Sequence, residues 1–255
     1  MLEALQKLEK IAQSNLNIVI YGEQGTGKEW AAHLVHTLSN RPPNLFVTVD
    51  CGALDHESAE KEIFGYENIT WKGIELKQGA FENAGNGTLL LNDFIALSVA
   101  LQVKVARALE YRSIRRILGQ DEISITARTI ATMTQSPDEA NDGHAMRKDL
   151  YHRIGVIAIA LPPIRERKGD IPRLIDYFLA DLLATPGAPP KRISPEALHC
   201  CCSYSWPGNL RHLKNAIEYA SIMCSDDIIL PEHLPEYLLE QNIDSLSGRQ
   251  IVGRK

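Results

Sequence analysis

Short apolar runs alternate with amphipathic segments from the N-terminus to about residue 161. Runs rich in β-branched and aliphatic residues predict five strands, at 17–21, 45–50, 89–93, 128–134 and 155–161. A charged amphipathic helix is expected at 1–13. Further helices are expected at 99–111 and at 29–38, where Trp30, Leu34 and Leu38 share one face. We predict an edge strand or hairpin at 123–127 and a polar loop at 135–144. Strands that alternate with helices favour a parallel sheet covered on both faces.

The pattern changes after Pro163, where no further apolar run resembles a strand. Helices are predicted at 171–183, 194–204 and 208–223, and a breaker-rich segment lies at 185–190. The chain therefore reads as an α/β core followed by a small helical domain, with the boundary near Arg167–Asp170. We predict an α/β subdomain at 1–168, a helical subdomain at 169–242 and a tail or linker at 243–255.

Composition adds limits on where the protein works and what it contacts. The 255 residues are 44% hydrophobic and 23% charged, with a net charge of −5, as in ordinary soluble domains. The sequence contains no run of Lys and Arg, so we do not expect this segment to bind DNA directly. No stretch resembles a signal peptide or a membrane span, so we expect a cytoplasmic protein without membrane contact. Cys200, Cys201 and Cys202 are consecutive on a predicted helix and cannot converge on one metal, so we expect reduced, structural cysteines.

One loop carries recognisable chemistry. The segment GEQGTGKE follows the first strand and opens the next helix, and it matches the pattern G-x-x-x-x-G-K. Backbone N–H groups of such a loop wrap phosphates, and Lys28 is placed to reach the β- and γ-phosphates. Glu29 stands where Ser or Thr is usual and makes a poorer direct Mg²⁺ ligand. The residues expected to bind ATP or ADP are Gly22, Glu23, Gln24, Gly25, Thr26, Gly27, Lys28 and Glu29.

With the loop placed, nearly the whole chain, from about Glu3 to Glu240, resembles the AAA+ domain of bacterial sigma-54-dependent transcription activators. The segments that carry the resemblance, besides the loop, are EIFGYE, ALQVKVARALE, RKDLYHRI, LPPIRERKGDIPRLI and SWPGNLRHLKNAIEYA. The resemblance implies a P-loop AAA+ core, with a parallel sheet flanked by helices, and a small C-terminal helical lid. It also implies a self-assembled ring, usually a hexamer, with ATP between subunits. RNA polymerase holoenzyme or a sigma factor is the implied partner.

The resemblance assigns roles to three arginines. Arg147 and Arg153 fall on the family's arginine fingers, which reach the γ-phosphate held by the neighbouring subunit; the alternative is a surface or interface ion pair. A planar, permanently charged guanidinium suits that task. Arg211 matches the lid arginine that contacts nucleotide within its own subunit, although the WPGN segment before it is also open to a purely structural reading.

Four positions depart from the family pattern, and all of them bear on hydrolysis. Asn92 stands where the family has the Walker B Asp, and Asp93 where it has the catalytic Glu. Asp93 is one methylene shorter, and a loss of reach of ~1 Å can cost roughly a hundredfold in rate. Asp50 replaces an Asn that hydrogen bonds the catalytic Glu, and Thr134 replaces the Asn at the end of the sensor strand. We expect Mg²⁺ binding, centred on Asp93, to be weakened.

Two alternatives for this strand end stay open. Asp50 or Asp93 could take over the metal-binding role that Asn92 lacks. A register slip would instead make Asp93 the metal-binding Asp and place Phe94 at the position of the Glu, which also removes the base.

The loop that the family uses to contact its target is altered too. ITWKGI at 69–74 occupies the expected loop tip, with Trp71, Lys72 and Gly73 as candidate contact residues, and GAF at 79–81 belongs to the segment that enters the Walker B strand. An exposed Trp can still anchor a partner. The usual sigma-54 contact is not expected.

Two functions compete. One is an active ATPase ring that remodels the sigma-54 RNA polymerase holoenzyme. The other is a regulatory module that binds nucleotide, controls transcription and hydrolyses ATP weakly or not at all. By resemblance, variant members act with other sigma factors and some bind cyclic di-GMP, for which no residue here marks a site. We favour the second function because changes at the Walker B strand end, at Asp50, at the sensor position Thr134 and in the target-contacting loop coincide.

Overall fold

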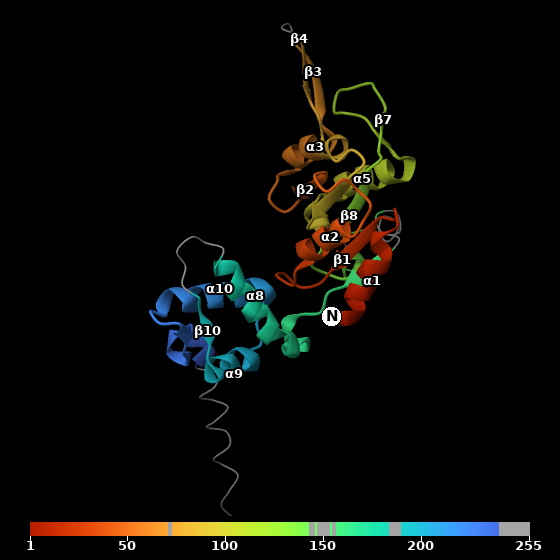
Figure 1. The fold of residues 1–255 in the computed structure, drawn as a ribbon. Coiled ribbons are helices and arrows are strands. Elements are labelled where there is room, and N and C mark those ends of the chain that lie inside the picture. The colour runs from red at the N-terminus through yellow and green to blue at the C-terminus, as the bar shows by residue number, and fades with distance from the viewer. Residues whose placement is uncertain (71–72, 143–145, 147–153, 155–156, 184–189, 240–255) are drawn as a thin grey trace, which may run out of the picture. The chain divides into compact units, whose positions relative to one another are not determined.

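The computed structural model describes the chain except for residues 71–72, 143–145, 147–153, 155–156, 184–189 and 240–255. The chain divides into two compact units, shown in Figure 1. Unit 1 comprises Met1–Glu23 and Gly27–Leu161. Unit 2 comprises Gln24–Thr26 and the chain from Pro162 onward. Three residues of the phosphate loop thus pack with the C-terminal unit, although they lie early in the sequence.

Unit 1 is built on a parallel five-stranded sheet in the order β2-β5-β8-β1-β9. The strands are β1 (Ile18–Tyr21), β2 (Phe46–Asp50), β5 (Thr88–Asn92), β8 (Arg128–Met133) and β9 (Ile157–Ala160). All five strands expected from the sequence are confirmed, with the described ends within one residue of the expected ones; residues 155–156 of the fifth lie outside the described residues. The shift at β5 matters, because the strand ends at Asn92 and Asp93 lies beyond it with a left-handed backbone, φ 54°.

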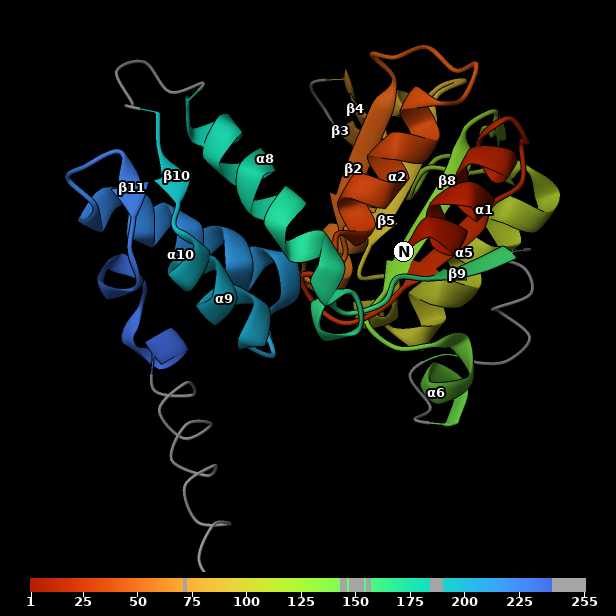
Figure 2. The same cartoon turned by 60° about the horizontal axis from the view of Figure 1, so that its bottom comes forward.

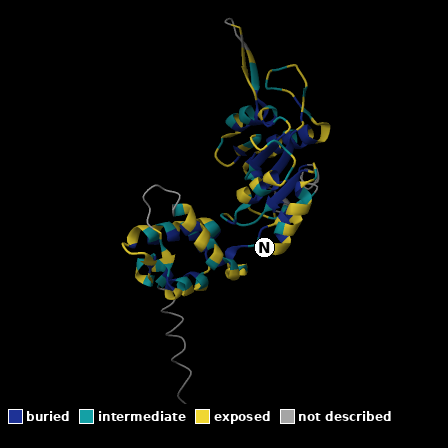
Figure 3. Cartoon of the chain, viewed as in Figure 1, coloured by how far each residue is buried: buried dark blue, intermediate teal, exposed yellow. Residues whose placement is uncertain are grey.

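Helices cover both faces of the sheet, as Figure 2 shows, and alternate residues of β1 belong to the cores on opposite faces. Ile18 and Ile20 pack in a core with α1 (Leu2–Ala12) and α2 (Lys28–Thr37). Val19, between them, belongs to the core on the other face, which includes α3 (His56–Phe64), α4 (Ala80–Asn83) and α5 (Val99–Tyr111). The inner strands β1, β5 and β8 are mostly dark blue in Figure 3 because both of their faces are covered, whereas the edge strands β2 and β9 are only partly buried.

In α2, Trp30 is exposed, and the buried residues are Ala31, Ala32, Val35 and His36, whose smaller side chains let the helix approach the sheet. One expectation about unit 1 is wrong. The segment expected as a loop contains a short helix, α6 (Pro137–Asp142). Its start is stabilised by reciprocal bonds, from Ser136 N–H to Glu139 Oε2 (2.8 Å) and from Glu139 N–H to Ser136 Oγ (3.2 Å).

Two hairpins extend unit 1 beyond the sheet. The longer pairs β3 (Tyr66–Thr70) with β4 (Gly73–Lys77), and Thr70 lies opposite Gly73. The shorter pairs β6 (Ser113–Ile114) with β7 (Ile123–Ser124), which confirms the expected hairpin segment. Arg116 holds the base of the longer hairpin, with two bonds to Glu82 (2.9 and 2.6 Å) and an ion pair with Glu67 of β3 at 3.6 Å.

A buried arginine secures the end of α1. The Arg128 guanidinium, at the start of β8, donates to the carbonyl oxygens of Ile11, Ala12 and Leu16. These carbonyls lie at and just beyond the helix C-terminus, where main-chain acceptors lack helical partners. Burial, and secondarily Arg41, lowers the pKa of Arg128 to about 10.

Unit 2 is a helical bundle made of α8 (Ile171–Leu183), α9 (Pro195–Ser203) and α10 (Asn209–Met223), with a short parallel pair, β10 (Arg192–Ile193) and β11 (Ile228–Ile229). The three helices expected after Pro163 are confirmed. Trp206 is fully buried in the core and donates from Nε1 to the carbonyl of Cys201 at 2.7 Å. All five cysteines are free. Within the described residues of both units, no helix has the length and apolar character needed to cross a membrane.

Candidate functional site

The first part of the phosphate loop, Gln24–Thr26, belongs to unit 2 and is held there through its main-chain carbonyls. Asn209 Nδ2 donates to the carbonyl of Gln24 at 3.1 Å, and Leu210 N–H donates to that of Gly25 at 2.8 Å. Asn209 is fully buried, with φ 52°, and its Oδ1 accepts from Ile164 N–H at 2.9 Å. The amide therefore joins the loop to the segment that precedes α8.

Arg167 binds the next residue of the loop. Its Nη2 donates to the carbonyl of Thr26 at 3.0 Å, while its Nε is buried with no hydrogen-bond partner in the described part of the chain. Burial lowers the pKa of Arg167, against a smaller opposing effect of Asp170. These donors fix the main-chain course of the loop at the N-terminal side of α2, where P-loop proteins bind phosphate.

The second part of the loop belongs to unit 1. Gly27, with φ 98°, precedes α2, and Lys28 and Glu29 form the first turn of the helix. The Lys28 ammonium donates to the carbonyls of Gly22 (2.8 Å) and Glu23 (3.0 Å). The lysine is thus folded over the loop, at the positive end of the helix dipole, where polyphosphate binds in P-loop proteins.

A chain of three hydrogen bonds connects the ends of β5 and β8 to α2. Asp93 N–H donates to Thr132 Oγ1 (3.0 Å), the Thr132 hydroxyl donates to Asn92 Oδ1 (2.6 Å), and Asn92 Nδ2 donates to Glu29 Oε1 (2.9 Å). We call these four residues the Asn92 network. Thr132 is fully buried and Glu29 is exposed, so the chain leads from the core to solvent.

The Asp93 carboxylate lies against the end of β2 rather than in the Asn92 network. A Cβ atom placed on Gly52 would be 3.3 Å from Asp93 Oδ2 and 3.6 Å from Asp50 Oδ1. Asp50 Oδ1 accepts from Gly52 N–H, whereas Asp93 Oδ1 is buried with no hydrogen-bond partner in the described residues. Both carboxylates also lie near Cys51, whose thiol pKa is raised to about 12 by burial first and by these charges second.

The other residues expected at the site are placed as follows. Thr134 is exposed just beyond β8, and Thr132, two residues earlier, joins the network instead. Arg211 is exposed on α10, and its Cβ lies 3.4 Å from a Cβ built on Gly25. Gly73 begins β4 with φ 127°. Trp71, Lys72, Arg147 and Arg153 lie outside the described residues.

Sequence reasoning missed Thr132, Arg167 and Asn209. The sheet register explains the first: Leu91 pairs with Ala131, so the next residues, Asn92 and Thr132, are neighbours on adjacent strands. This register follows from the strand order and has no local sequence signal. Asn209 did have a signal, because an Asn between Gly208 and a helix is a common turn residue that tolerates positive φ.

The strand end does not offer the donor set that Mg²⁺ prefers. Mg²⁺ is usually held by one or two carboxylates or hydroxyls besides the phosphates. The Asn92 amide is used on both atoms, and Glu29 Oε1 already accepts from it. Among the described residues, no three metal-binding side chains converge. The orphaned Asp93 Oδ1 is one carboxylate oxygen and falls short of this set.

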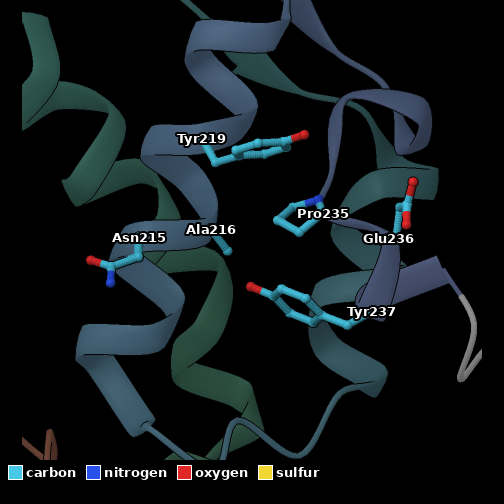
Figure 4. Close-up of a pocket in the computed structure, with 6 residues that line it drawn as sticks. All are labelled: Asn215, Ala216, Tyr219, Pro235, Glu236 and Tyr237. Carbon is cyan, nitrogen blue, oxygen red and sulfur yellow. The ribbon is translucent and has the colours of Figure 1, made fainter.

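Unit 2 also has an open groove of about 590 Å³ beside α10, shown in Figure 4. It contains none of the phosphate-loop residues and only one charged side chain, Glu236, so it does not resemble a polyphosphate site. The lining residues are Asn215, Ala216, Tyr219, Pro235, Glu236 and Tyr237.

A glycine-rich loop between a parallel strand and a helix, with a lysine at the helix start and a polar strand end beside it, defines a P-loop protein. The chain belongs to the Sigma-54 interaction domain family, which residues 1–160 match, and residues 165–250 match the AAA+ ATPase lid domain. The family resemblance noted from the sequence is thus confirmed, as is the expected α/β P-loop fold with a helical lid.

Similar proteins include several bacterial regulators. The chain is 39% identical over 230 residues to the response regulator protein PilR of Pseudomonas aeruginosa, covering 89% of this chain and 52% of PilR. It is 36% identical over 239 residues to the nitrogen fixation protein AnfA of Azotobacter vinelandii, covering 93% and 45%. The chain thus spans about half the length of these relatives.

A solved structure with a similar fold is that of NtrX from Brucella abortus in complex with ATP. The two chains are 31% identical with a TM-score of 0.85, over 94% of this chain and 54% of NtrX. NtrX in complex with ADP gives a TM-score of 0.84 at 30% identity, over 93% and 53% of the two chains.

Proposed function

We propose that this chain is the nucleotide-binding core of a bacterial transcription regulator, that it binds ATP or ADP, and that it hydrolyses ATP weakly or not at all. The observation that carries the proposal is the Asn92 network. It forms a strand end without the usual pair of acids, beside a phosphate loop that is complete. Binding and turnover depend on different parts of this site, so one can persist without the other.

Nucleotide binding is supported by the loop. Lys28 lies at the N-terminus of α2, and the carbonyls of Gln24, Gly25 and Thr26 are held by donors from unit 2. A preorganised backbone lowers the entropy cost of binding a polyphosphate. The NtrX structures with ATP and ADP support the same nucleotides here.

Weak hydrolysis is supported by the position of Asp93. A general base must reach the attacking water. The Asp93 carboxylate instead lies against Gly52 beside a second carboxylate, Asp50, which has no N–H to donate to it. Hydrolysis therefore lacks both a long acidic side chain and the amide that would orient it.

The partner proposal follows the family with one change. Relatives are named as sigma-54-dependent regulators, such as SfnR of Pseudomonas putida. We propose that this chain assembles into a ring of its own copies, usually a hexamer, and acts on RNA polymerase holoenzyme or a sigma factor. The contact would use the hairpin β3–β4, with Trp71, Lys72 and Gly73 in place of the family loop, and would differ from the usual sigma-54 contact.

The test compares binding with turnover in the same preparation. We expect calorimetry to show ATP and ADP binding that Lys28→Ala abolishes, because the variant lacks the phosphate cation. We expect steady-state ATP turnover at least a hundredfold below the median enzyme rate of ~10 s⁻¹. Turnover near that median would support the alternative, an active ATPase ring that remodels the sigma-54 holoenzyme.

A double variant tests why turnover is weak. Asn92→Asp with Asp93→Glu restores the two acids of the family, so we expect it to raise turnover if Arg147 and Arg153 act as fingers. An inactive double variant that binds ATP normally would place the defect in assembly or in the fingers instead.

A further inference from the structure

The direction of the hydrogen bonds fixes how the Asn92 amide is oriented. The Glu29 carboxylate can only accept, so the Asn92 atom that contacts it is the donor Nδ2. The Thr132 hydroxyl, which accepts from Asp93 N–H, then donates to the remaining amide oxygen. Asn92 Oδ1 is therefore the atom that faces Thr132, and Nδ2 faces Glu29 at 2.9 Å. The amide donor ends on a carboxylate, which makes this a charge-assisted bond.

An aspartate at position 92 would face Glu29 differently. One oxygen would still accept from Thr132, and the other would take the place of Nδ2, 2.9 Å from Glu29 Oε1. Two carboxylates that close repel each other, unless a proton or a cation lies between them or one side chain swings away. Two facing carboxylates thus need a cation or a shared proton to keep this geometry, whereas the Asn92–Glu29 pair needs neither.

We propose that this chain binds ATP independently of divalent cations, because the Asn92 amide takes the structural place of a cation between β5 and the start of α2. This inference rests on the proposed nucleotide binding and goes further, since it identifies the form of the ligand as the metal-free nucleoside triphosphate. Glu29 and Asn92 act as positioning residues, which keep the first turn of α2 and Lys28 in register with the strand end.

The main test needs no variant. ATP binding to the 255-residue chain is measured by calorimetry in excess MgCl₂ and again in excess EDTA. We expect the two dissociation constants to agree within about threefold, whereas a tenfold difference corresponds to ~1.4 kcal/mol of cation-dependent binding. Binding that falls tenfold or more in EDTA would overturn the inference and leave the proposed nucleotide binding intact. Failure to bind ATP in either condition would instead overturn both.

Variants test the Asn92–Glu29 contact itself. We expect Asn92→Asp to bind ATP at least tenfold more tightly in Mg²⁺ than in EDTA, and Glu29→Gln in that background to remove most of the difference. Asn68→Asp, an exposed change of the same charge in β3, is the matched control and should behave as the unchanged protein. Equal affinities in both conditions for a folded Asn92→Asp variant would contradict the proposed role of the amide.

A second readout does not use ATP. Binding of Mn²⁺ alone, followed by the relaxation of water protons, should be undetectable in the unchanged protein and appear in Asn92→Asp. Tight Mn²⁺ binding by the unchanged protein that Asn92→Asp does not alter would overturn the inference.

Discussion

The two parts of the phosphate loop are held in different ways. Gln24, Gly25 and Thr26 are bound through carbonyl oxygens by donors from unit 2. Lys28 and Glu29 are positioned in unit 1 by contacts of their own side chains. A main-chain contact tolerates almost any side chain on the loop but depends on its partner. A side-chain contact changes its chemistry when one atom changes, as between Asp and Asn at position 92.

The comparison predicts the largest effect at Gly25. Its φ is 77°, and a Cβ there would lie 2.3 Å from the carbonyl oxygen of Gly208, so Gly25→Ala adds strain and a clash. We expect a loss of about 3 kcal/mol in the free energy of unfolding, from ~1–2 kcal/mol of left-handed backbone strain plus overpacking. Urea unfolding measures it.

Gly169→Ala is the matched control, since a Cβ at Gly169 meets nothing within 4 Å. Its effect should stay within about 0.5 kcal/mol. Equal losses in the two variants would show that the loop is not packed against Gly208.

A smaller effect is expected from Asn209→Asp. The change keeps the acceptor for Ile164 N–H and removes the donor to the Gln24 carbonyl. An unsatisfied buried group costs ~1–3 kcal/mol, so we expect a loss of about 2 kcal/mol together with weaker ATP binding. Thermal unfolding measures the loss of stability, and calorimetry measures the ATP affinity. The control is Asn215→Asp, at an exposed position on the same helix. Unchanged ATP affinity would mean that Asn209 stabilises unit 2 without organising the loop.

The smallest effect is expected at Thr132, whose side chain belongs to the Asn92 network. Thr132→Val removes the hydroxyl that joins Asp93 to Asn92, and we expect a loss of about 1 kcal/mol, the net value of a typical hydrogen bond. Thr132→Ser should retain most of the stability. Thr134→Val, at an exposed position, should lower the free energy of unfolding by less than ~0.5 kcal/mol. A larger cost at Thr134, measured by urea unfolding, would return the sensor role to the position expected from the sequence.

Much of the fold could be predicted because its signals are local. The five strands are short apolar runs between breakers, and α5 and α8 have the predicted ends because apolar residues repeat at helical spacing. The sequence placed Trp30, Leu34 and Leu38 on one face of α2 but did not show that the small residues Ala31 and Ala32 form the buried face. The helix α6 was missed because its residues are polar and its signal is a capping box.

The site was only partly predictable for a different reason. The loop residues and the end of β5 follow from a contiguous motif. Thr132, Arg167 and Asn209 are brought to the site by strand register and by the packing of unit 2, over separations of up to 185 residues. Such neighbours are set by the tertiary fold, which a single sequence does not display.

The placement of the tryptophans has a spectroscopic consequence. Of the three in the chain, Trp30 lies in unit 1 with 60% of its surface exposed, and Trp206 lies in unit 2 and is fully buried. In a Trp71→Phe background each unit would carry one fluorophore, one in water and one in an apolar core. Iodide would then quench the red-shifted emission of Trp30 first, and the loss of the blue-shifted emission would report the unfolding of unit 2 alone.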